Sequence, residues 1–448
     1  MPRPNVVYID CHDLGDWLGC YGRPDLETPN LDGLAAAGAR FGRHIATAPI
    51  CIPSRSSMYT GSLPHEVGVI GQEPLAPGTI CMAARFRRAG YRTVLCGRLM
   101  VPNDPHWVGF ERQIATVPEE QAAAAAAFIE GQRGEDAPFL LQVSFTQCHR
   151  PFGAAFDPEV PDRIAVPPYL PETGATRRDL ATLAWQIRDL DARIGRILAA
   201  VDRAGLRERT VVVFTTEHGP AVARAKHTIY DSGLRTALLM RLPGAIAPGR
   251  TVDELSSNVD LLPTLADLCG VAQPQGIQGM SWAAQLGADE PAAPLRRWAF
   301  SQLNWGRRSG RWYYTPARSI RSSRYKLIRS YRRVPIFVDN GWLARFAGDR
   351  ETVERWYGSP LPDTQLFDLA EDPFELRDLA GDPALADVEA QLRERLDQHL
   401  RATGDPVLRG PVANRAGEPD VCQWQEQPDG SFSLAPDDPM DTDETSFT

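Results

Sequence analysis

Four short stretches of the sequence concentrate residue types that can carry out chemistry. They are Asp10 to Asp13, Cys51 to Arg55, Cys148-His149 and Glu217-His218. Carboxylates are the ligands that hard divalent cations prefer. A histidine titrates near neutral pH and can act as a general acid or base. These types make metal binding and proton transfer the first chemistries to consider.

Strand-like runs alternate with helix-like segments over most of the chain. The strand-like runs cover residues 6–9, 91–95, 139–145 and 211–214. The helix-like segments cover residues 31–38, 119–132 and 178–204. Such alternation predicts an α/β fold with a large mixed, mainly parallel sheet between helices. Ligands bind at the carboxyl ends of the strands in such sheets, where three of the four polar stretches fall.

The pattern changes near Pro291, and we expect three parts. Residues 1–291 are expected to form a catalytic α/β domain. Residues 292–405 are expected to form a smaller α+β domain, with strands at 297–302 and 318–330 and an amphipathic helix at 385–400. Residues 406–448 are rich in Pro, Gly, Asp and Ser and predict a mostly irregular tail.

Composition excludes some classes of protein. The chain has 448 residues, of which 43% are hydrophobic and 23% charged, and a formal net charge of −9. An acidic chain is a poor generic nucleic-acid binder, because such proteins need a basic face to neutralise phosphates. No apolar run is long enough to span a bilayer, so no membrane partner is expected. Any anion site must therefore be a local basic pocket.

The amino terminus and the cysteines bear on the cellular compartment. Met1 to Pro4 leads directly into the first strand-like run, and no secretory signal precedes it. Eight cysteines lie far apart, with no Cys-x-x-Cys pair. We expect a reducing, cytoplasmic setting in which most thiols are buried packing residues. This applies to Cys11, Cys20, Cys81, Cys96, Cys148 and Cys269.

The stretch around Cys51 carries a resemblance to a known family. Cys51-Ile52-Pro53-Ser54-Arg55, followed by Thr60-Gly61, resembles the Cys-x-Pro-Ser-Arg signature of the type I formylglycine-dependent sulfatases, in the alkaline-phosphatase-like superfamily. Further blocks follow the family's order over about residues 4–405. They are Asp13 to Gly15, Gly19 to Gly22, Thr28 to Asp32, Gly97-Arg98, His149, Thr216 to Gly219, Lys226 to Arg235, Val259 to Thr264, Gly276 to Gly279, Arg318 to Arg329 and Leu366 to Leu369.

The resemblance implies a sulfatase that hydrolyses a sulfate ester of a small organic molecule or sugar. In this family a formylglycine-generating enzyme oxidises the cysteine, here Cys51, to an aldehyde, which is then hydrated. One hydroxyl of the hydrate attacks sulfur, and the second helps to expel sulfate and restore the aldehyde. A divalent metal, usually Ca²⁺ or Mg²⁺, holds the hydrate and a sulfate oxygen.

The resemblance also implies the metal ligands. Asp13 matches the second of two consecutive family aspartates, and His12 stands where the first would be. Glu217 and His218 match a later pair that is usually Asp-Asn or Asp-His, and Cys51 completes the set after conversion. A set richer in histidine suits Mn²⁺ or Zn²⁺ better than Ca²⁺. Asp10, two residues before His12, is a further candidate ligand.

The remaining site residues carry over in the same way. By position, Arg55 holds the aldehyde hydrate, Lys226 contacts the sulfate and His149 lies near the leaving oxygen. Arg98 replaces a family lysine, keeping its charge but not its geometry. Met100 replaces a family histidine and cannot titrate. The candidates for its role are His227, His106 and His65, and spacing does not decide among them.

Two other functions and two features of the pocket stay open. The alternatives are a phosphonate monoester or phosphodiester hydrolase of the same superfamily and a catalytically weak, sulfate-binding homologue. Aromatic residues at Trp305 and at Trp312 to Tyr314 either stack on a sugar or pack between domains. Arg307, Arg308 and Arg311 either bind a second anionic group or form a solvated loop. The sequence indicates neither the particular ester nor the oligomeric state.

Overall fold

The computed structural model describes residues 3–152, 164–287, 294–308, 311–338, 340–343, 349–414, 417 and 419–435. Its centre is a nine-stranded sheet in the order β4-β3-β5-β1-β6-β8-β2-β7, with β9 beside β2. The strands are β1 (Asn5–Cys11), β2 (Ala39–Ile45), β3 (Arg92–Gly97), β4 (Arg112–Ile114), β5 (Phe139–Phe145), β6 (Thr210–Thr216), β7 (Arg235–Thr236), β8 (Leu238–Arg241) and β9 (Arg250–Ser257).

The sheet is mixed and mainly parallel, as predicted. Strand β1 is parallel to both β5 and β6, with Val7 beside Leu141 and Val212. Strand β3 is parallel to β4 and β5. Strand β8 is antiparallel to both β6 and β2. The four strands expected from the sequence are all present, and the β2, β7, β8 and β9 half of the sheet was not expected.

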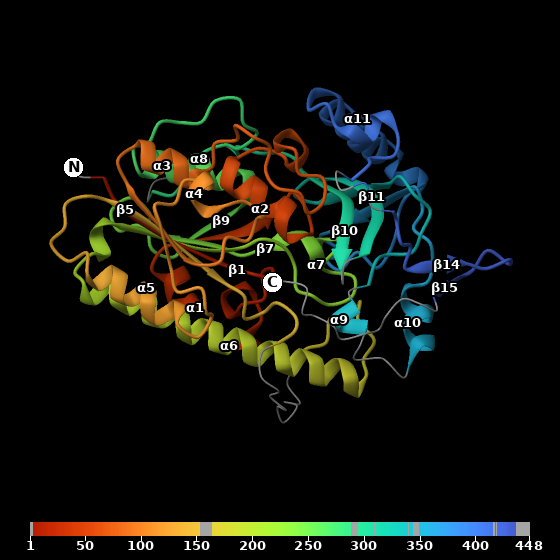
Figure 1. Ribbon diagram of the computed structural model, residues 1–448. Helices are drawn as coiled ribbons and strands as arrows, with labels where there is room; N and C mark the ends of the chain where they lie inside the picture. The colour runs from red at the N-terminus through yellow and green to blue at the C-terminus, as the bar shows by residue number, and fades with distance from the viewer. Residues whose placement is uncertain are drawn as a thin grey trace.

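Helices cover both faces of this sheet (Figure 1). On one face lie α1 (Pro29–Ala36), α5 (Gln121–Glu130) and α6 (Gly174–Arg203). On the other lie α2 (Cys51–Thr60), α3 (Met82–Arg88), α4 (Pro105–Val108) and α8 (Leu261–Leu268). Successive side chains of a strand point to opposite faces of the sheet, so the hydrophobic core is divided into two parts. Val7 and Ile9 of β1 join the core that contains α6, and Val6 and Tyr8 join the core that contains α3 and α8.

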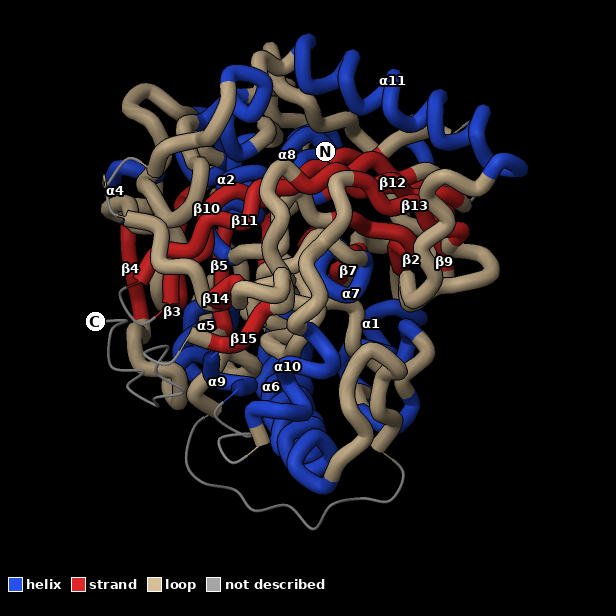
Figure 2. Tube along the Cα trace, turned by 90° about the vertical axis from the view of Figure 1, so that its right-hand side faces the viewer, coloured by secondary structure: helices blue, strands red, loops and turns tan. Residues whose placement is uncertain are grey.

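A second, antiparallel sheet follows in the order β10-β11-β12-β13. Its strands are β10 (Ala299–Arg308), β11 (Arg311–Arg321), β12 (Tyr325–Ser330) and β13 (Thr364–Asp368). Helix α11 (Ala386–Ala402) packs its Leu392, Leu396 and Leu400 against one face. Ala317 and Ile328 on the other face join the core of the large sheet. The small sheet is therefore held between α11 and the large sheet (Figure 2).

The part of the chain after residue 294 differs from the expectation in several places, because β11 already begins at Arg311 and β13 was not expected. The run 318–330 is two strands, because the Ser322 hydroxyl accepts hydrogen bonds from the amides of Arg324 and Tyr325 and turns the chain. A short hairpin, β14 (Trp424–Glu426) and β15 (Phe432–Leu434), lies in the stretch expected to be mostly irregular. Three short helices, α7 (Asp231–Leu234), α9 (Asn340–Leu343) and α10 (Arg350–Tyr357), complete the described part. The expected boundary near residue 291 lies outside the described residues, and the division into domains stays a prediction.

A buried charge cluster ties the small sheet to the chain segment that leads away from the site. The Asp231 carboxylate in α7 accepts hydrogen bonds from Arg321 Nε and Lys326 Nζ, both at 2.9 Å. Lys326 Nζ lies 2.8 Å from Glu375 Oε1, and Glu375 accepts from the Asp231 amide. Burial would raise the pKa of Asp231, but Arg321 and Lys326 hold it well below its usual range. Removing one partner of such a buried pair costs about 3–5 kcal/mol.

Among the helices in the described ranges, none combines the length and the apolar character that a membrane span requires.

Candidate active site

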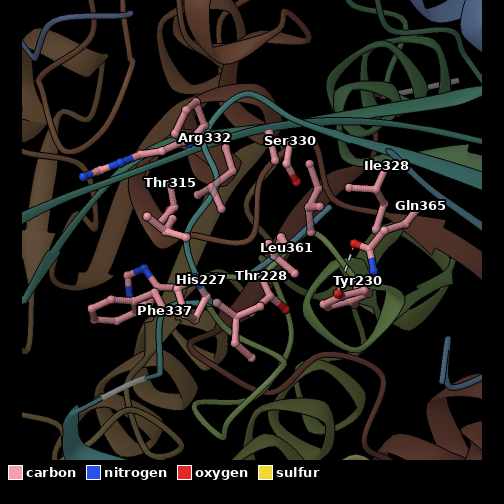
Figure 3. Close-up of a pocket in the computed structure, with 17 residues that line it drawn as sticks. His227, Thr228, Tyr230, Thr315, Ile328, Ser330, Arg332, Phe337, Leu361 and Gln365 are labelled. Atoms are coloured by element: carbon pink, nitrogen blue, oxygen red, sulfur yellow. Dashed lines mark hydrogen bonds between the residues drawn. The ribbon is translucent and has the colours of Figure 1, made fainter. Parts of the chain in front are cut away.

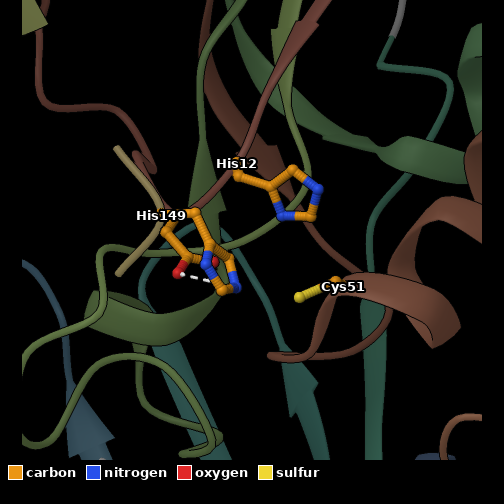
Figure 4. Close-up of side chains that lie close together, drawn as sticks. His12, Cys51 and His149 are labelled. Carbon is orange, nitrogen blue, oxygen red and sulfur yellow. Dashed lines mark ion pairs between the residues drawn. The ribbon is translucent and has the colours of Figure 1, made fainter. Parts of the chain in front are cut away.

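The predicted site residues meet at one edge of the large sheet. His12 and Asp13 follow β1, His149 follows β5, and Glu217 and His218 follow β6. These three strands are adjacent and parallel, so their carboxyl ends lie together. Cys51 is the first residue of α2, on the same edge. The side chains of His12, Cys51 and His149 face one another across this edge (Figure 4).

The start of α2 presents Cys51 to the site. Ile50 before it is extended, with φ −141° and ψ 144°, and no side chain caps the helix. Pro53 fits the first turn of a helix, where a backbone N–H has no partner within the helix. The Ser54 hydroxyl donates to the Glu217 carbonyl and accepts from Asn258 Nδ2 at 2.7 Å. The Glu217 backbone is thereby fixed against the helix that carries Cys51.

Asp13 is the carboxylate at the centre of the site. It has a φ of 52°, a left-handed conformation in which Asp is enriched. Its amide donates to Glu217 Oε1 at 3.2 Å. Lys226 Nζ donates to Asp13 Oδ2 at 2.7 Å, and His149 Nε2 lies 3.8 Å from the same oxygen. His218 Nε2 lies 3.3 Å from the other oxygen, Oδ1, which accepts no hydrogen bond.

The donor atoms form two overlapping groups that suit a metal ion. One group is His12, Asp13, Cys51 and His149, and the other is Asp13, Cys51, Glu217 and His218, with the ligand atoms of each group within 4.8 Å of one another. Asp13 Oδ1 is buried and accepts no hydrogen bond, and the buried His12 Nδ1 lies 3.1 Å from Glu217 Oε1. Buried polar atoms rarely stay unsatisfied. These residues therefore fit a divalent cation.

His218 is oriented as metal-binding histidines are. Its Nδ1 lies 2.8 Å from the Gly219 carbonyl oxygen, so Nδ1 donates and Nε2 keeps its lone pair in the neutral ring. That Nε2 lies 3.4 Å from both Cys51 Sγ and Glu217 Oε1. A carbonyl partner on the far nitrogen thus aims the ligand nitrogen at the centre of the site.

Arg55 is fully buried behind the site. Its Nη1 lies 2.5 Å from Asp10 Oδ1, and its Nη2 lies 3.5 Å from Glu217 Oε2. Asp10 Oδ2 also accepts from Gln142 Nε2 and Ser144 Oγ, both at 3.1 Å. Asp10 is thus a partner of Arg55 and belongs to neither metal-donor group, and its candidacy as a ligand stays a prediction.

Sequence reasoning missed Gln142, Ser144 and Asn258. Gln142 and Ser144 stand two residues apart in the otherwise apolar strand β5, so they share one face of it. Two polar side chains on one face of a fully buried strand are a signal that was available. Asn258, which holds Ser54, gives no comparable signal because it is the first residue of the short helical turn that directly follows strand β9.

The charges of the site shift its pKa values. Burial would raise the pKa of the Cys51 thiol, but Lys226, with hydrogen bonds to His12 and His218, lowers it to about 6. Burial and Arg55 both disfavour the His12 imidazolium, yet Glu217 and Cys51 raise its pKa to about 9. Burial would raise the pKa of Asp13, but Lys226, His149 and His218 hold it well below its usual range. Without a cation, the site therefore favours a thiolate at neutral pH.

A pocket of about 640 Å³ opens in front of these residues. Cys51, His12, His149 and Lys226 line its inner part, and Arg98, Met100, His227 and Arg307 also contribute to its wall. Its volume is in the range of small-molecule sites. The structure thus brings every site residue predicted from the sequence to the pocket or directly behind it.

Only one of the three candidate replacements for the missing histidine lines this pocket. His65 bonds to Gln302 Oε1 at 2.6 Å and to the Thr403 carbonyl oxygen at 3.1 Å. His106 bonds to the Phe110 carbonyl oxygen at 2.9 Å. His227 lines the pocket that contains Cys51, and its ring centroid lies 4.7 Å from that of Phe337.

His227 also borders a second, small cavity between the loop after β6 and the small sheet (Figure 3). This cavity measures about 30 Å³ and has mainly apolar walls, including Phe337 and Leu361. That is room for about one water molecule, too little for a substrate. The aromatic residues expected near the substrate are mostly packed, since Trp305, Trp312 and Tyr313 are 6%, 7% and 2% exposed. Their burial supports the packing alternative.

Comparison with known proteins identifies relatives over most of the chain. The family model "Sulfatase" matches residues 4–271, and the model "N-sulphoglucosamine sulphohydrolase, C-terminal" matches residues 218–339. An ulvan-active sulfatase of Formosa agariphila is 26% identical over 474 residues, covering 90% of this chain and 76% of that protein.

Solved structures share the fold. One is of a protein in complex with its substrate D-glucosamine-2-N,6-O-disulfate, with a TM-score of 0.67 and 19% identity, covering 91% of this chain and 99% of that one. Another is a phosphonate monoester hydrolase from Silicibacter pomeroyi, with a TM-score of 0.67 and 20% identity, covering 96% and 99% of the two chains.

The lowered thiol pKa predicts how unmodified, chelator-treated protein reacts with iodoacetamide. Because the thiolate is the nucleophile, labelling of Cys51 should rise with pH around a midpoint near 6. Cys20, whose pKa burial and Asp32 raise to about 12, should stay unlabelled at pH 7. Lys226→Met should move the Cys51 midpoint upward. Peptide mass spectrometry measures both sites, and a wild-type Cys51 midpoint near 9 would contradict the geometry.

Proposed function

The chain belongs to the sulfatase family and is a sulfuric ester hydrolase, and we propose that it acts on a sulfated saccharide through a formylglycine made from Cys51. The observation that carries the proposal is the position of the Cys-x-Pro-Ser-Arg motif. Cys51 is the first residue of α2, lines the pocket and belongs to both metal-donor groups. The ulvan-active relative and the neighbour bound to a sulfated glucosamine support the saccharide class.

Four residues of the chain would hold a divalent cation together with residue 51. They are His12, Asp13, Glu217 and His218. Such a cation supplies Lewis acidity and a template for the anionic group when it is bound. As its hydrate, a formylglycine at position 51 would supply the hydroxyl that attacks sulfur.

The other residues manage charge around the ester. Lys226 lines the pocket beside Asp13 and is placed to neutralise a sulfate oxygen. Arg55 lies one helical turn after Cys51, on the same side of α2, and holds the carboxylates of Asp10 and Glu217 in place. The family resemblance implies that Arg55 also holds the aldehyde hydrate at residue 51, and we propose that role here.

His149 is the proposed general acid for the leaving alcohol. It lines the pocket, and its Nε2 lies 3.5 Å from Lys226 Nζ. Its loop is fixed by the next residue, Arg150, whose Nη1 donates to Asp179 Oδ1 and whose Nε donates to the Ala221 carbonyl, both at 2.8 Å. A fixed imidazole at the pocket wall can donate a proton to a departing oxygen.

The donor set favours a softer metal than the family resemblance implied. Ca²⁺ prefers six to eight oxygen ligands, whereas the nitrogens of His12 and His218 lie among the donors here. Imidazole suits borderline ions, so we assign Mn²⁺ or Zn²⁺ in preference to Ca²⁺ or Mg²⁺.

The metal assignment predicts a shift in binding preference. In calorimetric titrations of chelator-treated protein, Mn²⁺ or Zn²⁺ should bind at least tenfold more tightly than Ca²⁺. His12→Asp restores an oxygen ligand and should lower the ratio of the Mn²⁺ or Zn²⁺ affinity to the Ca²⁺ affinity. His106→Asn, away from the pocket, should leave it unchanged. Tighter binding of Ca²⁺ by the wild type would refute the assignment.

Activity tests the function itself. With the modified protein, an aryl sulfate should be hydrolysed faster than the matched aryl phosphate diester and phenylphosphonate. Cys51→Ala removes the nucleophile and should lower turnover by several orders of magnitude without changing the fold by circular dichroism. Cys422→Ala, in the β14 region, is the matched control. Full activity of Cys51→Ala would refute the nucleophile.

The same panel addresses the second candidate. The fold shared with a phosphonate monoester hydrolase motivates that reading. Turnover of the phosphonate faster by orders of magnitude would favour it, and no turnover of any ester would favour a sulfate-binding homologue. The formylglycine-generating enzyme as a partner and a cytoplasmic location stay predictions from the sequence.

A further inference from the structure

Among the described residues that line the pocket in front of Cys51, the Lys and Arg side chains have no acidic counterpart. Four cationic side chains line it, Arg98, Arg150, Lys226 and Arg307, and no Asp or Glu is among the described residues of its wall. The chain as a whole carries a formal charge of −9. Cations gathered in a pocket of an acidic protein create a local positive potential that attracts anions. The pocket is therefore built for a negatively charged molecule.

Two of these cations are engaged within the protein. Lys226 pairs with Asp13 at 2.7 Å, and Arg150 pairs with Asp179 through both of its Nη nitrogens. Arg98 and Arg307 are exposed. The backbone of Arg307 accepts from Gln72 Nε2 at 3.2 Å, and its guanidinium lies 5.7 Å from the centre of the Trp312 ring. The pocket thus has an inner cationic group at the reaction centre and exposed guanidinium groups elsewhere on its wall.

Arg98 stands where two cavities meet. A polar cavity of about 520 Å³ shares Arg98, Leu99 and Thr116 with the pocket that contains Cys51. Asn103 and Gln113 add hydrogen-bonding groups to that second cavity. A molecule that reaches from Cys51 into the second cavity would lie along the wall that Arg98, Leu99 and Thr116 share. The combined space suits a substrate longer than the single ring that carries the sulfate ester.

The backbone explains why Arg98 faces this junction. Gly97 ends β3 with a φ of 101°, a conformation that side chains rarely adopt. A Cβ on Gly97 would lie 2.6 Å from Gln121 Nε2 and 2.9 Å from the Ser144 carbonyl oxygen. The chain therefore turns sharply at the strand end, next to β5, and Arg98 emerges as an exposed residue. The negative charge of the Asp13 carboxylate is balanced by three other groups, Lys226, His149 and His218.

We infer that Arg98 is a specificity residue that binds a second anionic group of the substrate, a carboxylate or a second sulfate on a sugar adjoining the one that is desulfated. The inference rests on the proposed action on sulfated saccharides and differs from a role of Arg98 at the cleaved ester. A planar guanidinium forms two parallel hydrogen bonds with such oxyanions, which a lysine cannot do. This explains an arginine at a position where the related family has lysine.

The test measures binding and turnover separately. Three disaccharides of equal size are titrated into the metal-loaded protein by calorimetry: one with a uronate carboxylate, one with a sulfate at that carbon and one with a neutral hydroxymethyl group. The wild type should bind the anionic disaccharides at least about tenfold more tightly than the neutral one. The ratio of the affinities for the carboxylate and the sulfate disaccharides identifies the preferred oxyanion.

Variants then assign the discrimination to Arg98. Arg98→Gln should reduce the ratio of the anionic to the neutral disaccharide affinity to near one. Arg98→Lys should restore part of the preference for the anionic disaccharides through charge alone. Arg401→Gln, an exposed residue on α11, should keep the wild-type ratio. If the neutral disaccharide binds as well as the anionic ones, or if Arg98→Gln keeps the discrimination, the inference is wrong.

Turnover of p-nitrophenyl sulfate separates this inference from the proposed function. Discrimination by Arg98 without any turnover would leave the inference standing and contradict the sulfatase. Turnover without discrimination would support the sulfatase and contradict the inference about Arg98. If Arg98→Gln lowers kcat on this monoanionic substrate by orders of magnitude while the disaccharide ratio persists, Arg98 belongs to the cleavage centre and the inference fails.

Discussion

The structure depends on keeping three carboxylates buried at the ends of adjacent strands. Asp10, Asp13 and Glu217 are all fully buried, and each ionised carboxylate loses a large hydration free energy on burial. Arg55, also fully buried, contacts Asp10 and Glu217, and Lys226 contacts Asp13. A cation in the donor groups would balance the charge that remains. The metal site and the buried arginine are therefore parts of one electrostatic arrangement.

This arrangement also links the small sheet to the chemistry. Lys226 is followed by His227, which adopts a left-handed conformation with a φ of 64°. The His227 amide donates to the Pro49 carbonyl at 3.0 Å, two residues before Cys51, and its ring packs on Phe337. A Cβ at position 306 would lie 2.8 Å from His227 Nδ1, so Gly306 of β10 leaves room for the ring. The small sheet thus supports the segment that places Lys226.

Much of the fold and the convergence of the site were predictable from the sequence. Apolar runs such as Phe139 to Phe145 are buried on both faces and predict parallel strands, and parallel strands bring their ends together. The β2 strand was missed because Arg40, Arg43 and His44 interrupt its apolar pattern. His44 is nevertheless buried and bonds to Ser256 Oγ at 2.9 Å, a partner that only the folded chain supplies. The hydrogen-bonding partners of Asp10 were likewise not predictable, because Gln142 and Ser144 lie far away in the sequence.

Peptide mass spectrometry across Cys51 tests the central claim most directly. The protein would be made in cells that also produce the formylglycine-generating enzyme, and a second preparation from cells without it would show the unmodified thiol. We expect the first preparation to carry an aldehyde at position 51, with the mass of formylglycine. A thiol at that position in both preparations would contradict the proposed nucleophile, and with it the mechanism assigned to the pocket.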